Sequence, residues 1–166
     1  MATTHHAAAR RGSARRAPAK TNALALLKSD HAEVAALLDR FEKGKRRMKD
    51  EKKQALALEI CRKLTVHATI EEEIFYPAVA REVDDAEDLL EEAKVEHASL
   101  KSLIAKIERS APQSDAYEAL VKVLGEYVKH HVKEEHTELF PTVRKSDLDL
   151  AAIGAQLAAR KRALAG

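Results

Sequence analysis

Apolar residues recur every three or four positions along almost the whole chain after residue 21, which is the spacing of one face of an α-helix. Four long segments and one short segment show this spacing, with short polar stretches between them. Short connections favour antiparallel neighbours, so the chain is predicted to be all-α: an up-down-up-down four-helix bundle followed by a short fifth helix. The helices are predicted to begin or end near Asn22, Gly44, Pro77, Asp84 or Asp85, Asp115, Asp149 and Leu157.

Residues with short polar side chains precede several of these segments and can accept hydrogen bonds from the first backbone N–H groups of a helix. The predicted caps are Asn22, Asp84 or Asp85, Asp115 with Glu118 as a capping box, and Asp149 together with Ser146.

Each apolar stripe is interrupted by polar residues that keep its spacing. The apolar members of the stripes are Leu24, Leu27, Val34, Leu38 and Phe41; Leu56, Ile60, Leu64 and Ile74; Leu90, Ala93, Leu100, Ile104 and Ile107; and Leu120, Leu124, Val128 and Leu139. The interruptions are His31 in the first, His67 and Glu71 in the second, His97 in the third, and His131 and Glu135 in the fourth. Residues four apart share a helix face, so each His–Glu pair is predicted to point into the bundle at one object.

The chain repeats itself at the level of helix pairs. "HATIEEEIFYP" at residues 67–77 matches "HVKEEHTELFP" at residues 131–141, and "DHAEVAALLDRFEK" matches "EHASLKSLIAKIER". Two copies of one helical hairpin packed face to face would give the bundle an approximate two-fold symmetry.

Two carboxylates buried near each other are strongly unfavourable unless positive charge compensates them. Two divalent cations would do so, and four His with two Glu suit Fe, Mn or Zn better than Ca or Mg. The alternative is a structural bundle whose core histidines are hydrogen-bonded.

His130 and Glu134 have the same four-residue spacing, but only His131 stands ten residues before its proline, as His67 does before Pro77. We therefore predict His130, His136, Glu72 and Glu73 to be neighbours of the site or surface residues, and Tyr127 to be a packed aromatic.

Charge is uneven along the chain. The net charge is +2, but residues 1–20 contain five Lys and Arg and no acid, and lack an apolar stripe. We predict a disordered basic tail over 1–20 and a single domain over 21–166. The tail could also act as a transit peptide or touch nucleic acid or anionic lipid, although no nucleic-acid-binding fold accompanies it. No apolar run is long enough for a membrane span, and a lone cysteine, Cys61, fits a reducing, cytoplasmic location.

The two repeated motifs, with one His in each of the other two helices, resemble the hemerythrin-like family, the HHE cation-binding domain, over about residues 22–144. The resemblance implies a non-heme di-iron centre in which an oxo or hydroxo bridge joins the irons. It implies terminal ligation by His31, His67, His97 and His131, and bridging by Glu71 and Glu135. Oxygen-carrying members place a further His one turn after the ligand of the third helix, where this chain has Lys101.

Three functions are compatible with these residues. The first is a cytoplasmic di-iron protein that senses or detoxifies O₂, peroxide or NO under oxidative stress, with or without weak enzymatic turnover. The second is a passive module that binds or stores iron or O₂, and the third is the metal-free bundle. The missing fifth imidazole argues against reversible O₂ carriage, because it leaves an open position on each iron.

Overall fold

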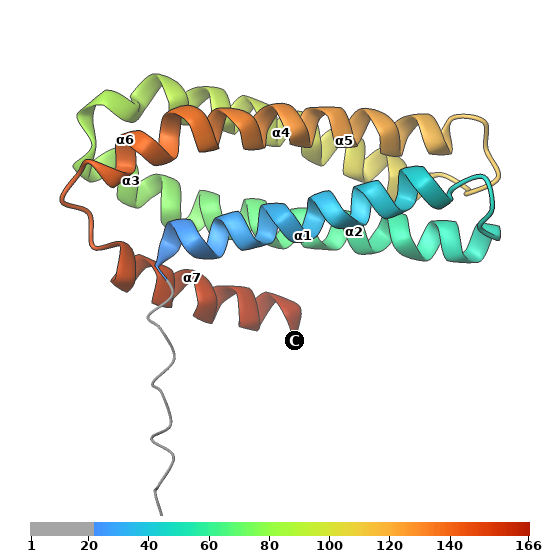
Figure 1. Ribbon diagram of the computed structural model, residues 1–166, viewed down its shortest axis with the longest axis horizontal. Coiled ribbons are helices and arrows are strands. Elements are labelled where there is room, and N and C mark those ends of the chain that lie inside the picture. The colour runs from blue at the N-terminus through green and yellow to red at the C-terminus, as the bar shows by residue number, and fades with distance from the viewer. Residues whose placement is uncertain (1–21) are drawn as a thin grey trace, which may run out of the picture.

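The computed structural model describes residues 22–166, which form helices and no strand, and confirms the all-α prediction (Figure 1). The predicted disordered tail lies outside the described residues. In chain order the elements are α1 Ala23–Gly44, α2 Asp50–Ile70, the π-helical η1 Glu71–Phe75, α3 Tyr76–Glu82, the 3₁₀ turn η2 Asp84–Ala86, α4 Glu87–Arg109, α5 Tyr117–Glu134, the π-helical η3 Glu135–Leu139, α6 Phe140–Arg144 and α7 Leu150–Ala165.

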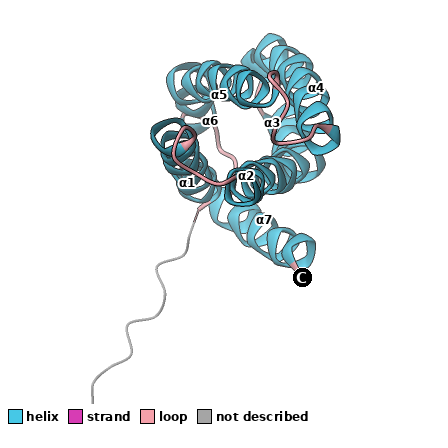
Figure 2. Ribbon diagram, turned by 90° about the vertical axis from the view of Figure 1, so that its right-hand side faces the viewer, coloured by secondary structure: helices cyan, strands magenta, loops and turns pink. Residues whose placement is uncertain are grey.

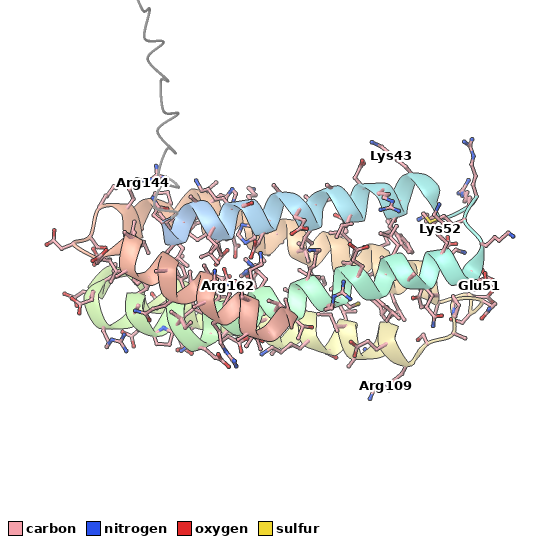
Figure 3. The ribbon with its side chains drawn as sticks, turned by 90° about the horizontal axis from the view of Figure 1, so that it is seen from below. Lys43, Glu51, Lys52, Arg109, Arg144 and Arg162 are labelled. Carbon is pink, nitrogen blue, oxygen red and sulfur yellow. The ribbon has the colours of Figure 1, made fainter. Side chains whose placement is uncertain are left out.

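Four long rods make up the bundle. α1 and α4 are two of them, and the others are α2 continued by η1 and α3, and α5 continued by η3 and α6. Seen end-on they surround a common axis, with α7 outside the ring against α1 and α2 (Figure 2). Charged side chains such as Lys43, Glu51 and Arg109 project from the outer surface (Figure 3). Within residues 22–166 no helix combines the length and the apolar character needed to cross a bilayer.

Two apolar clusters fill the bundle. One, towards the end that contains α3 and α6, includes Leu27, Ile70 and Phe75, and the other, towards the α1–α2 turn, includes Phe41 and Ile60. Each such side chain contributes about 1.5–3 kcal/mol by leaving water, so these clusters drive folding. Along every rod the inward-facing His lies between members of the two clusters, and these positions form one polar layer across the bundle.

The second and fourth rods each contain one π-helical turn. The backbone N–H of Tyr76 bonds to the carbonyl of Glu71, and that of Phe140 to the carbonyl of Glu135, five residues back in both cases. A proline, Pro77 or Pro141, follows each turn after one intervening residue. Because a proline ring collides with the carbonyl four residues earlier in a continuous α-helix, the wider turn accommodates it.

The extra residue in the π turn changes which side chains face inward. Ile74 was predicted to continue the stripe of the second helix, but it is only half-buried, and Phe75 is fully buried instead. The stripe prediction was wrong here because it assumed an unbroken α-helical period.

Two predicted caps are confirmed. The Asn22 side chain accepts a hydrogen bond from the Ala25 N–H at 2.8 Å, and Asp149 accepts from the N–H groups of Ala151 and Ala152. These residues begin α1 and α7.

Two predicted caps are wrong. Asp84 and Asp85 lie in a 3₁₀ turn, and α4 begins after them without a side-chain cap. Asp115 makes no cap bond to α5, while Glu118 pairs with Lys53 of α2 at 2.7 Å. At α5 a contact with another helix therefore replaced the local capping pattern.

α7 continues past Leu157 and docks through charged groups. Arg160 binds Glu73 through two hydrogen bonds of 2.6 and 3.0 Å, and Lys161 binds the buried Asp30. The final helix is thereby attached to both α1 and η1.

Candidate metal centre

The polar layer contains all six of the residues singled out by the sequence. Each has at most 5 % of its surface exposed: His31 on α1, His67 on α2, Glu71 at the start of η1, His97 on α4, His131 on α5 and Glu135 at the start of η3.

The imidazoles form two pairs, one from each helical hairpin. In the first pair, Nε2 of His31 lies 2.8 Å from Nε2 of His67. In the second pair, Nε2 of His97 lies 3.2 Å from Nε2 of His131. Each hairpin thus points two ring nitrogens at one place.

The two carboxylates lie between the pairs. Oε2 of Glu71 is 3.2 Å from Nε2 of His67 and 3.4 Å from Nε2 of His97. Oε2 of Glu135 is 3.2 Å from Nε2 of His31 in the first pair and 3.7 Å from Nε2 of His131 in the second. Each carboxylate therefore contacts one imidazole of each pair.

Three of the four outward-facing Nδ1 atoms are hydrogen-bonded: that of His31 to His136 Nε2 at 2.9 Å, that of His97 to Glu72 Oε1 at 2.9 Å, and that of His131 to Glu96 Oε2 at 2.7 Å. Nδ1 of His67 lies 3.5 Å from Asp30 Oδ2 and makes no hydrogen bond. A carboxylate can only accept, so in the second pair each Nδ1 carries the hydrogen. A neutral imidazole then presents its Nε2 lone pair to the interior, which is the form that binds a metal.

The inward-facing atoms lack the partners that buried polar atoms normally have. Both oxygens of Glu71 and Oε2 of Glu135 are buried without a hydrogen bond. Two neutral imidazoles whose hydrogens are on Nδ1 cannot bond to each other through Nε2.

Cations would satisfy these atoms. One ligand atom from each member of two groups lies within 4.8 Å of the others: His31, His67, Glu71 and Glu135 in one group, and Glu71, His97 and His131 in the other. The groups share a carboxylate, so the residues fit two metal ions side by side.

Protons balance part of this charge when no cation does. Burial opposes the charged form of His67, but Glu71, Asp30 and Glu135 outweigh it and raise its pKa to about 10. Burial also opposes the charged form of Glu71, yet His67 and His97 hold the pKa of that carboxyl well below its usual value. A metal that binds here must displace a proton from His67, so metal affinity should fall as the pH falls.

Tyr76 follows the first π turn and reaches the layer. Its O–H donates to Oε1 of Glu135 at 3.0 Å and lies 3.3 Å from Nε2 of His97. Burial and the nearby carboxylates raise its pKa well above the ordinary value, so the phenol keeps its proton. The residue at the same place in the second hairpin is Phe140, whose ring lies parallel to that of His31 at a centroid distance of 6.0 Å.

Sequence reasoning did not find Asp30, Glu96 or Tyr76. The repeat contained a signal for the two acids, since one precedes His31 and the other precedes His97. Adjacent helical residues point in different directions, so each acid reaches the His of the next long helix instead of its own neighbour. Tyr76 could be found only by knowing that a π turn precedes it.

Lys101 stands one turn after His97 and is not oriented towards the imidazoles as a ligand would be. Its ammonium group binds both oxygens of Glu72 at 2.7 and 2.6 Å, and half of its side chain is exposed. It therefore neutralises the acid that holds Nδ1 of His97.

Two other side chains lie apart from the layer. Tyr127 is half-exposed, so its predicted packing was wrong. His130 is 63 % exposed and contacts Glu134, while His131 is buried, which agrees with the predicted inward position of His131 on the fourth long helix, α5.

A cavity of about 20 Å³ adjoins the layer. Such a volume holds roughly one water-sized molecule. Its walls combine the four imidazoles with apolar side chains, among them Val34, Leu64, Leu100, Ile104 and Val128.

The chain matches the hemerythrin HHE cation binding domain over residues 22–143, a span that includes the whole polar layer. It belongs to this family. The matched HHE domain ends before α7, so the docked final helix lies beyond it.

Two similar proteins place this HHE domain in context. A crystal structure of a hemerythrin HHE cation binding domain-containing protein from Mycobacterium kansasii has the same fold, with a TM-score of 0.71, 24 % identity and 86 % of each chain covered. A protein of Nostoc sp. described as a DNA nickase is 26 % identical over 121 residues, which are 73 % of this chain and 33 % of that protein. The chain thus spans about a third of that relative.

Proposed function

We propose that the polar layer holds two iron ions and that the chain uses them to bind or react with a small oxidant, O₂, peroxide or NO, in sensing or detoxification. The observation that carries this proposal is the meeting of unpartnered buried carboxylates, inward-facing imidazoles and a small, mainly apolar cavity. Without a metal those carboxylate oxygens have no hydrogen bond, and a proton on His67 balances only part of their charge.

The ligands follow from the two groups of donors. His31 and His67 would hold one iron, and His97 and His131 would hold the other. Glu71 and Glu135 would each serve both irons, because each contacts an imidazole of both pairs. Iron held there would supply the Lewis acidity and electrons that these side chains lack.

The protein contributes exclusion of water and control of protons. The apolar wall of the cavity favours a small neutral ligand over bulk water, and its volume limits the ligand to a few atoms. Tyr76 keeps a hydrogen on its Oη and fixes Oε1 of Glu135 through it. Lys101 remains with Glu72, so only four imidazoles would be available to hold two metals, and these residues would leave room for a small ligand on them.

The test combines metal content with gas chemistry. Protein loaded anaerobically should contain two irons per chain. The reduced form, mixed with O₂ in a stopped-flow spectrometer, should oxidise irreversibly, and the oxidised form should consume peroxide slowly. Recovery of the original spectrum by purging with inert gas would show reversible O₂ binding and indicate an O₂ carrier. A metal content near zero would favour the metal-free bundle.

The second candidate is a passive module that stores iron or O₂ without turnover. The exclusion of bulk solvent from the layer favours it equally. Repeated additions of peroxide separate the two: a reactive centre consumes each addition at a similar rate, whereas a passive module gives at most one equivalent.

A further inference from the structure

A second group of candidate ligands lies on the outer surface between α4 and α5. We call Glu96, His130 and Glu134 the surface trio. Nε2 of His130 is 3.0 Å from Oε1 of Glu134 and 3.4 Å from Oε1 of Glu96. One atom from each of the three lies within 4.8 Å of the others.

A His–Glu pair four residues apart on an exposed helix is common and stabilises it only slightly. The surface trio differs in two ways. Its third member comes from another helix, and two carboxylates are brought together there while Glu92 lines the same gap. This concentration of negative charge is suited to a cation.

The gap beneath the surface trio leads to the polar layer. It has a volume of about 10 Å³ and is lined by Glu96 and Glu134 together with His131 and Glu135. Glu135 is 2 % exposed, and its Oε2 has no hydrogen-bond partner. An unpartnered buried carboxylate thus lies in the same gap as the surface carboxylates.

Glu96 joins the two places directly. Its Oε1 faces His130, while its Oε2 accepts the hydrogen of His131 Nδ1 at 2.7 Å. Occupation of the surface trio and the position of one imidazole of the second pair therefore depend on the same carboxylate.

A cation cannot reach the polar layer through apolar packing, because removing its water without replacing it is prohibitively unfavourable. A wider groove between α1 and α5 also reaches His31, but lysines share its rim with acids and repel a cation. The α4–α5 gap also has apolar walls, Leu89, Ala93 and Leu139, but its polar lining consists only of carboxylates and an imidazole, which can replace the water of a cation.

We propose that the surface trio is a transient site for a divalent cation, such as ferrous iron, from which metal enters the polar layer. The step is an exchange of ligands without change in oxidation state. Bonds from the cation to His130 and the surface carboxylates break as bonds to Glu135 and His131 form, and the remaining water ligands leave to solvent. The transfer rests on the proposed metal-binding function of the polar layer, whereas the surface site itself does not.

The kinetic test uses the full-length apo protein and Co²⁺ under anaerobic conditions, with the visible absorption of bound Co²⁺ as the readout. His130→Ala and Glu134→Gln should each slow loading about tenfold, since a charge-lined cleft raises the rate of cation entry by roughly that factor or more. The final metal content and the thermal midpoint of the loaded protein should stay unchanged. Glu126→Gln is the matched control, because it removes the same charge from the same helix two turns earlier, where Glu126 pairs with Lys129.

If both variants load metal at the wild-type rate, the proposed transfer is wrong. It is also wrong if Glu126→Gln slows loading equally, because the effect would then come from the overall charge of the helix. The site is tested separately by titrating loaded protein with Mn²⁺ and measuring free Mn²⁺ by electron paramagnetic resonance. One additional weak site that Glu134→Gln abolishes supports the proposal, and no additional site, or one unaffected by Glu134→Gln, overturns it. Wild-type protein that binds no Co²⁺ in its interior refutes the proposed function, while the Mn²⁺ titration still decides the surface site.

Discussion

The two helical hairpins orient their imidazoles alike but surround them differently. In the second pair, Nδ1 of His97 and Nδ1 of His131 both donate to carboxylates. In the first pair, Nδ1 of His31 faces Nε2 of another histidine, His136, instead of a carboxylate. Burial and the nearby His31 and Lys28 lower the pKa of His136, so this partner is neutral. The other partner in that pair, Asp30, lies 3.5 Å from its His and is already bound by Lys161.

Matched positions of the repeat account for the difference. Glu72 and His136 each follow a layer carboxylate, and Tyr76 and Phe140 each follow a π turn. The repeated framework thus determines where the ligands converge, while a few unmatched residues set the charge and the proton donors around each pair. Because an anionic partner strengthens an imidazole as a ligand, we expect the second pair to hold its metal more tightly.

The largest expected effect is the loss of both metal ions when one of the two layer carboxylates is removed. Glu71→Ala and Glu135→Ala should each reduce metal content from two ions to well below one, since each carboxylate contacts both pairs. Elemental analysis after anaerobic loading measures this, with exposed Glu138→Ala as the control. Loss of only one ion would mean that each carboxylate serves its own hairpin.

Removing the metal should lower the stability of the whole bundle. A ligand at a thousand times its dissociation constant stabilises a protein by about 4 kcal/mol, or roughly 10 °C for a domain of this size. Calorimetry of loaded and chelator-treated protein tests this expectation. Hydrogen exchange sharpens it, because amides beside the first pair should lose protection at lower chelator concentration. Equal thermal midpoints would favour a plain helical core.

Replacing the side chain that contacts Nδ1 of one imidazole should change the metal affinity of that imidazole pair and leave the other pair unchanged. Glu72→Gln should weaken the second metal about tenfold, and His136→Glu should strengthen the first by a similar factor. Competition with a coloured chelator gives both affinities. Glu73→Gln is the control, because Glu73 is adjacent in sequence but pairs with Arg160 on α7. A uniform effect on both ions would remove the distinction between the pairs.

The last effect concerns the single phenol of the layer and falls on the stability of the metal-free protein instead of on metal binding. Tyr76→Phe makes this position like Phe140 and removes a hydrogen bond to Glu135, which should destabilise the metal-free protein by about 1–3 kcal/mol. Urea unfolding measures the loss, and the half-exposed Tyr127→Phe should leave stability unchanged. Equal values for the two variants would show that Glu135 does not depend on this donor.

Much of the layer was predictable, because a polar residue that keeps the period of an apolar stripe must share its face. That argument placed His31 and His97 correctly from spacing alone. It failed beyond Glu71, where the π turn changes the period and turns Phe75 inward in place of Ile74.

Contacts between distant segments could not be inferred from local patterns. Lys161 binds Asp30 across 131 residues of chain, and Glu118 pairs with Lys53 of another helix instead of completing a cap with Asp115. Such pairs depend on how rods pack, which neither periodicity nor capping preference specifies.

The π turns also limit how the chain can change in length. A π turn holds one residue more than an α turn, so deleting one residue between Glu71 and Tyr76 would leave an ordinary α-helix with the segments on both sides nearly in register. Pro77 would then stand in a continuous α-helix, where its ring collides with the carbonyl four residues earlier. A deletion in the α-helical part of a rod would instead rotate every side chain beyond it by roughly 100° about the helix axis. Changes in length should therefore be tolerated in the polar turn at residues 45–49 and be unfavourable along the rods.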